Sequence, residues 1–322
     1  MFDQTLETMQ KTQVALLSVI SNTLLVSLKL IVGIIIGSVS IISEAIHSGI
    51  DLIAAIIAFF AVKTSGKPAD KEHPFGHGKF ENISGTVEAI LIFVAAIWIL
   101  YESIHKLINP SLMEMAEMGV IIMFISTTAN LFVSKMLFKV GRETDSVALL
   151  ADAWHLRTDV YTSAGVMIGL GIIWLGKLFF PSLNLTWVDP VAAIFVALLI
   201  TKAAWDLTAD SVKDLLDTSL SPDEEELIRN YIKDVSSLAY GFHGLKTRKA
   251  GGHRFIEFHL AVNPDISVKE SHAISDKIEG IILEHFPRAD IIIHIEPCDG
   301  TCEINCISGC MTPERQQKYS PT

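Results

Sequence analysis

Six long apolar stretches constrain this chain more than any other feature of its sequence. They lie in the first two thirds of the 322 residues, over approximately 12–36, 39–63, 82–108, 117–140, 147–178 and 188–208. Each reaches the roughly 20 residues that a helix needs to cross a bilayer. Backbone polar groups in lipid must hydrogen-bond within their own segment, so each stretch is predicted to be a helix. One such helix could be buried in a soluble protein, but six in succession predict a membrane domain over residues 1–209.

The rest of the chain has a different pattern. A polar, amphipathic segment begins after Ser221, which is a suitable N-cap residue. Two alternating segments flank Gly251 and Gly252, and a helical segment and a final strand-like segment follow. The order helix–strand–strand–helix–strand predicts a small α+β domain over residues 210–300, followed by a tail over 301–322. A domain of this size has a limited core, so we expect support from a second copy.

Lysine and arginine in the short loops predict the orientation in the membrane. With the N-terminus inside, eight basic residues lie on the inner side and two, Lys106 and Lys177, on the outer side. The eight are Lys11, Lys63, Lys67, Lys71, Lys79, Lys135, Lys139 and Arg142. Both termini and the α+β domain are therefore expected in the cytoplasm, and the chain is expected to be a multi-pass protein of the cell (inner) membrane.

Two of the apolar stretches each carry a histidine and an aspartate four residues apart. These are His47 and Asp51 in the second stretch, and His155 and Asp159 in the fifth. Residues at this spacing share a helix face, and ionisable groups in a membrane indicate function. Two facing helices would bring together two imidazoles and two carboxylates, a set that suits tetrahedral zinc. The alternative is that each pair only makes polar contacts between helices.

A loop after the second stretch holds Asp70, His73 and His77. Pro74 and Gly76 favour a loop over a helix. From the residues alone, a metal site and a solvated surface loop are equally good interpretations.

Three motifs together resemble the cation diffusion facilitator family, whose members export divalent metals in exchange for protons. They are SEAIHSGID at residues 43–51, HPFGHGKFE at 73–81 and DAWHLRTDV at 152–160. The resemblance covers the whole chain and implies six transmembrane helices, a metallochaperone-like cytoplasmic domain and a homodimer. It also implies that His47, Asp51, His155 and Asp159 form the transport site, and that Asp70, His73 and His77 bind a second zinc ion.

The resemblance implies further roles in the α+β domain. Four histidines and one carboxylate match family metal-binding positions: His243, His259, His272, His294 and Glu296. Relatives of this type carry aspartate at the bridging position, where this chain has Glu296. A lysine at the position of Lys79 joins an aspartate at the position of Asp217 in relatives, which links the two domains.

The cysteine-containing tail falls outside the family pattern. Cys298, Cys302, Cys306 and Cys310 are spaced four residues apart. In a reducing cytoplasm they either bind zinc or a softer metal, or belong to a disordered reduced tail.

Arg157 lies between His155 and Asp159 in the sequence but points off the helix face that these two residues share. We expect Arg157 to form a structural ion pair, and the alternative is that it lies near an aqueous cavity.

The sequence therefore predicts a zinc/proton antiporter, with Fe²⁺, Cd²⁺, Co²⁺ or Mn²⁺ as alternative cargo. A channel is disfavoured because tight multidentate binding slows ion passage, and a membrane metal sensor or scaffold would not need the intramembrane quartet. An enzyme is not expected, since no nucleophile–base motif is present. The net charge of −11 argues against a nucleic-acid partner.

Overall fold

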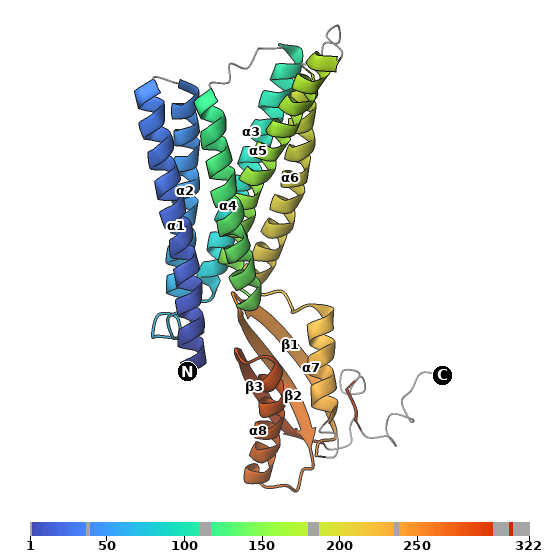
Figure 1. Ribbon diagram of the computed structural model, residues 1–322. Coiled ribbons are helices and arrows are strands. Elements are labelled where there is room, and N and C mark those ends of the chain that lie inside the picture. Colours follow the sequence, from blue (N-terminus) through green and yellow to red (C-terminus); the bar gives the residue numbers. More distant parts are fainter. Residues whose placement is uncertain are drawn as a thin grey trace, which may run out of the picture. The chain divides into compact units, whose positions relative to one another are not determined.

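The chain divides into two compact units, residues Met1–Leu215 and Leu216–Thr322. The computed structural model describes residues 2–36, 39–109, 117–179, 187–234, 238–298 and 309–311. Unit 1 contains six long helices, as the apolar stretches predict (Figure 1). They are α1 (Phe2–Ile36), α2 (Val39–Ser65), α3 (Lys79–Ile108), α4 (Glu117–Glu143), α5 (Val147–Phe179) and α6 (Val188–Leu215).

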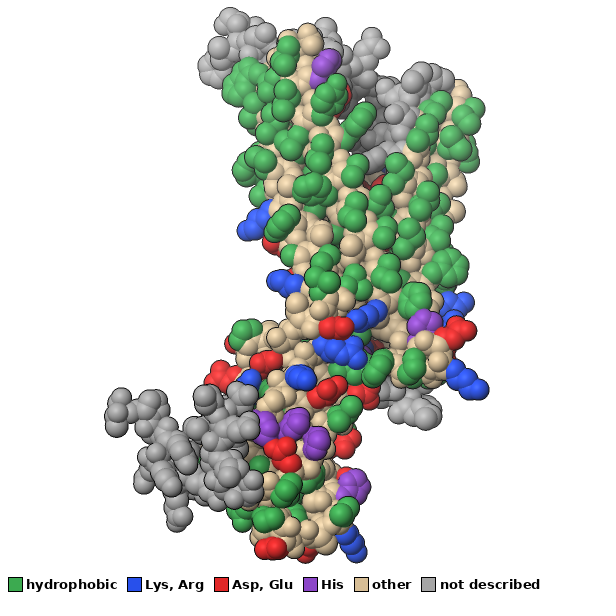
Figure 2. All heavy atoms as spheres, turned by 180° about the vertical axis from the view of Figure 1, so that it is seen from behind, with side chains coloured by type: hydrophobic (Ala, Val, Ile, Leu, Met, Phe, Trp, Pro, Cys, Tyr) green, Lys and Arg blue, Asp and Glu red, His purple; other side chains and the backbone are tan. Residues whose placement is uncertain are grey.

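Four of these helices, α1, α2, α3 and α6, are long and apolar enough to cross a membrane, judged on the described residues. Helices α4 and α5, with 27 and 33 residues, are also long enough to cross a bilayer. Hydrophobic side chains cover much of the surface of the bundle (Figure 2). Ile35, Trp98 and Phe195 are among the large hydrophobic residues that are exposed. Exposed apolar surface on this scale is expected for helices surrounded by lipid.

A buried carboxylate connects several helices of unit 1 near the start of α3. Glu81, in the first turn of α3, accepts hydrogen bonds from Lys11 of α1, Ser65 of α2 and Ser146 before α5. The side chains of Lys11 and Glu81 are both buried. A negative charge at this point is also favoured by the dipole of α3.

Unit 2 has the predicted order of elements. They are α7 (Pro222–Asp234), β1 (Gly241–Ala250), β2 (His253–Val262), α8 (Val268–His285) and β3 (Ala289–Pro297). Strands β1 and β2 pair antiparallel around a turn in which Gly251 has a φ of 59°, a left-handed conformation that favours glycine. Strand β3 pairs parallel to β2 after the crossover through α8, so the sheet order is β1-β2-β3. This confirms the predicted α+β fold.

One face of this sheet packs against the two helices. Phe258 and Leu260 of β2 are buried with Ile228 of α7 and Ile282 of α8 in a single apolar core. Because side chains alternate along a strand, the neighbouring residue His259 lies on the opposite face of the sheet. The packing of one face therefore leaves the other face open for polar side chains.

Candidate metal sites

The intramembrane site lies between α2 and α5. The His155 Nε2 atom is 2.9 Å from Asp51 Oδ1, and both side chains are buried. Asp51, His155 and Asp159 each offer a ligand atom, and these atoms lie within 4.8 Å of one another. His47 lies one helical turn before Asp51 in α2, but its side chain is outside the described residues. The structure thus brings together three of the four residues on which the sequence interpretation depends.

Polar groups from another helix support this site. Asn130 of α4 donates a hydrogen bond from Nδ2 to Asp159 Oδ2 at 3.2 Å. Such a contact fixes the orientation of a ligating carboxylate, as outer-shell partners do at metal sites.

Two further buried carboxylates lie close to the site and were missed in the sequence interpretation. Glu88 of α3 and Asp152 of α5 are almost fully buried, and each interacts electrostatically with His155. Ser84 donates a hydrogen bond to Glu88 at 3.3 Å. Glu88 could have been found from sequence, because it is the single charged residue of the apolar segment 82–100 and such charges indicate function.

The structure also corrects the expectation for Arg157. No carboxylate among the described residues pairs with it, and its guanidinium lies 5.4 Å from the ring centroid of Phe138. Arg157 instead lines a cavity between α4 and α5. The predicted ion pair is therefore wrong for the described part of the chain, because the residues that face Arg157 on α4 are aromatic and basic.

The loop between α2 and α3 gathers Asp70, His73 and His77. The Asp70 carboxylate lies 3.3 Å from His77 Nε2 and 3.6 Å from His73 Nδ1, and the two rings are 4.4 Å apart. Backbone N–H groups of His73 and Glu72 donate to Asp70 Oδ1, and these hydrogen bonds lower the pKa of the Asp70 carboxyl. An ionised carboxylate and two imidazoles together form a set of donors that suits zinc.

A third cluster lies on the open face of the sheet in unit 2. Glu296 of β3 lies between two histidines, with Oε1 3.1 Å from His243 Nε2 and Oε2 3.1 Å from His259 Nδ1. His294 stacks on His259 at 4.7 Å between ring centroids. His272 lies on α8 beside Asp276 and is mostly exposed, so it is not part of this convergence. Its role as a ligand remains a prediction.

The remaining predicted residues have other surroundings. The Lys79 ammonium lies 3.5 Å from the carbonyl oxygen of Leu215, and Asp217 accepts a hydrogen bond from Arg248 at 3.3 Å. A link between Lys79 and Asp217 would join the two units and stays a prediction. Cys298 is half-buried and Cys310 is buried, whereas Cys302 and Cys306 lie outside the described residues.

A membrane bundle with converging metal ligands, followed by an α+β domain with a His/Glu cluster, defines a class of metal-ion transporters. Comparison with known families agrees with this class. The model of the cation efflux transmembrane domain matches residues 15–216, and that of the cation efflux protein cytoplasmic domain matches residues 220–298. The chain therefore belongs to the cation efflux, or cation diffusion facilitator, family and is a multi-pass membrane transporter for cations.

Individual relatives are similar along most of their length. The chain is 33% identical over 285 residues to the uncharacterized transporter sll1263 of Synechocystis, covering 88% of this chain and 90% of the relative. It is 30% identical over 289 residues to the cation-efflux pump FieF of Citrobacter koseri, covering 88% and 92%. A solved structure described as the zinc form of the putative zinc transporter CzrB is 39% identical, with a TM-score of 0.26, covering 27% of this chain and 98% of that one.

Proposed function

We propose that this protein exports Zn²⁺ from the cytoplasm in exchange for protons, by alternating access of a site formed by His47, Asp51, His155 and Asp159. The observation that carries the proposal is the convergence of Asp51, His155 and Asp159 between α2 and α5. With His47, one turn from Asp51, the donor set is two nitrogens and two oxygens, which suits tetrahedral zinc.

Charge and protonation give this site its chemistry. Two carboxylates neutralise a divalent ion in surroundings of low dielectric. Zinc binds the neutral imidazole, so protons compete with the metal for the histidines. A site facing near-neutral cytoplasm takes up zinc, and the same site facing a more acidic exterior takes up protons and releases the ion.

The membrane potential makes proton exchange useful for export. Moving one elementary charge across the membrane changes the energy by about 2.3 kcal/mol per 100 mV. Exit of Zn²⁺ against an inside-negative potential therefore costs about twice this amount, and each entering proton offsets half of that cost.

The proposal includes the setting of the transporter. The chain lies in the cell (inner) membrane with both termini in the cytoplasm and functions as a homodimer. The clusters around Asp70 and Glu296 bind zinc as regulatory or structural sites, because each offers two imidazoles and a carboxylate at ligand distance from one another. The alternative cargo is Fe²⁺, Cd²⁺, Co²⁺ or Mn²⁺, because carboxylates and imidazoles also bind these ions.

Zinc flux into sealed vesicles tests this function. The purified chain is reconstituted in liposomes carrying a pH gradient. An enclosed dye that responds to the metal under test records its uptake, first for zinc and then for each alternative metal. We expect gradient-dependent uptake of zinc, and its loss in the double variant Asp51→Ala/Asp159→Ala.

The matched control is Asp206→Ala/Asp223→Ala, which removes two exposed carboxylates outside the three clusters. This control is expected to transport as the wild type does. Undiminished uptake by the Asp51/Asp159 variant would show that the quartet is not the transport site. Metal binding by the wild type without flux of any metal would favour a sensor instead.

A further inference from the structure

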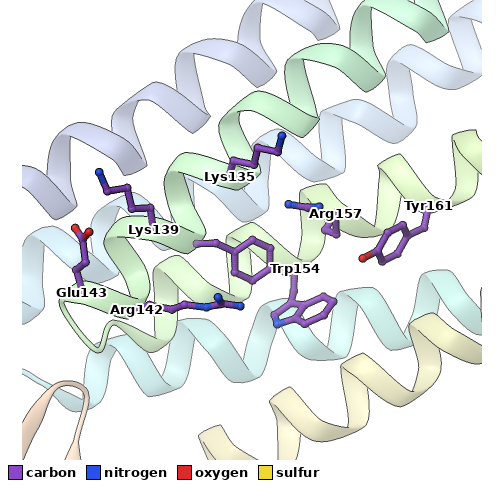
Figure 3. Close-up of a pocket in the computed structure, with 8 residues that line it drawn as sticks. Lys135, Lys139, Arg142, Glu143, Trp154, Arg157 and Tyr161 are labelled. Carbon is purple, nitrogen blue, oxygen red and sulfur yellow. The ribbon is translucent and has the colours of Figure 1, made fainter.

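A basic cavity between α4 and α5 is not used by the proposed transport mechanism. Its volume is about 570 Å³, within the range of small-molecule sites. Four cations and one carboxylate line it together with three aromatic rings (Figure 3). The lining residues are Lys135, Phe138, Lys139, Arg142, Glu143, Trp154, Arg157 and Tyr161.

The cations that line this cavity outnumber its carboxylates. Among the described residues, no carboxylate forms an ion pair with Lys135, Lys139, Arg142 or Arg157. Glu143 supplies one negative charge at the end of α4, so the lining carries a net excess of three positive charges. Like charges in one cavity repel each other, and an anionic occupant would relieve that repulsion.

The aromatic residues hold the guanidinium groups in place. The guanidiniums of Arg142 and Arg157 each lie 5.4 Å from the ring centroid of Phe138, and Trp154 packs edge-on against the same ring. The Nε atom of Arg157 is buried and has no hydrogen-bond partner among the described residues. A buried donor without a partner indicates a missing acceptor, and an anionic oxygen is the strongest acceptor for guanidinium.

The exposed face of α4 shows which kind of anion fits. This face is mainly apolar up to Phe132 and becomes basic from Lys135 onward. Its exposed residues in order are Ile121, Phe124, Ile125, Thr128, Phe132, Lys135, Lys139, Arg142 and, at the end of the helix, Glu143. The basic part, from Lys135 to Arg142, spans eight residues, or about 10 Å of helix, comparable to the headgroup layer of a bilayer.

We propose that this cavity binds the phosphate headgroup of an anionic phospholipid, with the acyl chains lying along the apolar face of α4. The guanidiniums and lysines bind the phosphate oxygens, and Phe138 and Trp154 border the glycerol region. A free phosphate ion shares the same anionic chemistry but gains nothing from the apolar face.

The test measures lipid binding by the full-length, delipidated protein in detergent, with native mass spectrometry and added phosphatidylglycerol. The variant Lys139→Gln/Arg142→Gln removes two exposed charges of the cavity, neither of which belongs to a candidate metal site. The matched control, Lys63→Gln/Lys67→Gln, removes two exposed charges at the end of α2 and after it. Phosphatidylcholine serves as the uncharged comparison.

We expect the wild type and the control to bind phosphatidylglycerol equally, and the cavity variant to bind it roughly 30-fold more weakly, at about 1 kcal/mol per basic residue. Phosphatidylcholine should bind all three proteins alike, and Lys139→Arg should keep wild-type binding. Equal phosphatidylglycerol binding by the cavity variant would overturn the proposal. Displacement of the lipid by excess inorganic phosphate would assign the cavity to a soluble anion and also overturn it.

Discussion

Glu296 shows how one side chain determines the geometry of a metal cluster. Its two carboxylate oxygens each lie 3.1 Å from a different histidine, His243 or His259. Glutamate is one methylene longer than the aspartate that relatives of this type carry at this position. In the structure the longer side chain reaches both imidazoles, because His243 of β1 and His259 of β2 are cross-strand partners and β3 pairs beside β2.

Removing the charge of Glu296 should weaken zinc binding to unit 2. We expect Glu296→Gln to lower zinc affinity at this cluster at least about tenfold, since the amide cannot supply a second anionic ligand atom. Competition of the full-length protein with a zinc chelator measures the affinity. Glu257→Gln, which changes an exposed residue of β2 outside the cluster, serves as the control, and an unchanged affinity in Glu296→Gln would contradict the assignment.

The ion pair between Glu224 and Arg254 makes the stability of unit 2 depend on pH. Partial burial raises the pKa of Glu224, but the Arg254 guanidinium and Ser221 lower it more, so the net pKa is below its ordinary value. The Arg254 guanidinium nitrogens lie 2.9 Å and 2.6 Å from Glu224 Oε1. A lowered carboxyl pKa contributes stability above the unfolded pKa, and this stability is lost as pH falls through the folded pKa.

We therefore expect Arg254→Met to speed hydrogen exchange of the β1 and β2 amides at pH 7. The part of this effect that comes from the ion pair should shrink as the pH falls below the ordinary glutamate pKa of about 4.3 and through the lowered pKa of Glu224 in the wild type. Hydrogen–deuterium exchange with mass spectrometry measures this in the full chain, with exposed Lys269→Met as the control. An exchange difference that grows as the pH falls would contradict this explanation.

At the scale of elements, several termini of unit 1 meet at Glu81. Sequence patterns predicted the helices but not this contact, because it joins residues up to 70 positions apart. The motif at residues 73–81 was interpreted through its histidines, and the glutamate at its end was not singled out. Its burial beside Lys11 shows that this end of the motif holds helices together.

Removing the Glu81 charge should destabilise unit 1. Glu81→Gln leaves Lys11 buried without its counter-charge, and breaking a buried ion pair in this way costs about 3–5 kcal/mol. Thermal unfolding of the detergent-solubilised protein should show a clearly lower midpoint. Glu72→Gln, in the exposed loop, is the control and should unfold as the wild type does. Equal midpoints for the two variants would show that the network contributes little.

At the scale of the whole molecule, periodicity and apolar length were sufficient to predict the order of the eleven elements in the described part of the chain. The i, i+4 spacing placed the ligands of each helix on one face, and the family resemblance implied that the two faces meet, as Asp51, His155 and Asp159 do. The surroundings of several side chains depend on tertiary packing and could not be predicted from the sequence. It placed Glu88 and Asp152 beside His155, surrounded Arg157 with aromatic and basic residues, and left His272 away from the sheet cluster.

Proton counterflow tests the central claim most directly. The full-length protein is reconstituted in liposomes containing a pH-sensitive dye, zinc is added outside, and zinc uptake and internal pH are recorded together. We predict that zinc entry drives protons out, so the internal pH rises, and that Asp51→Ala/Asp159→Ala abolishes both signals. Zinc entry by the wild type with no change in internal pH, under conditions where the potential is clamped, would contradict proton exchange at this site.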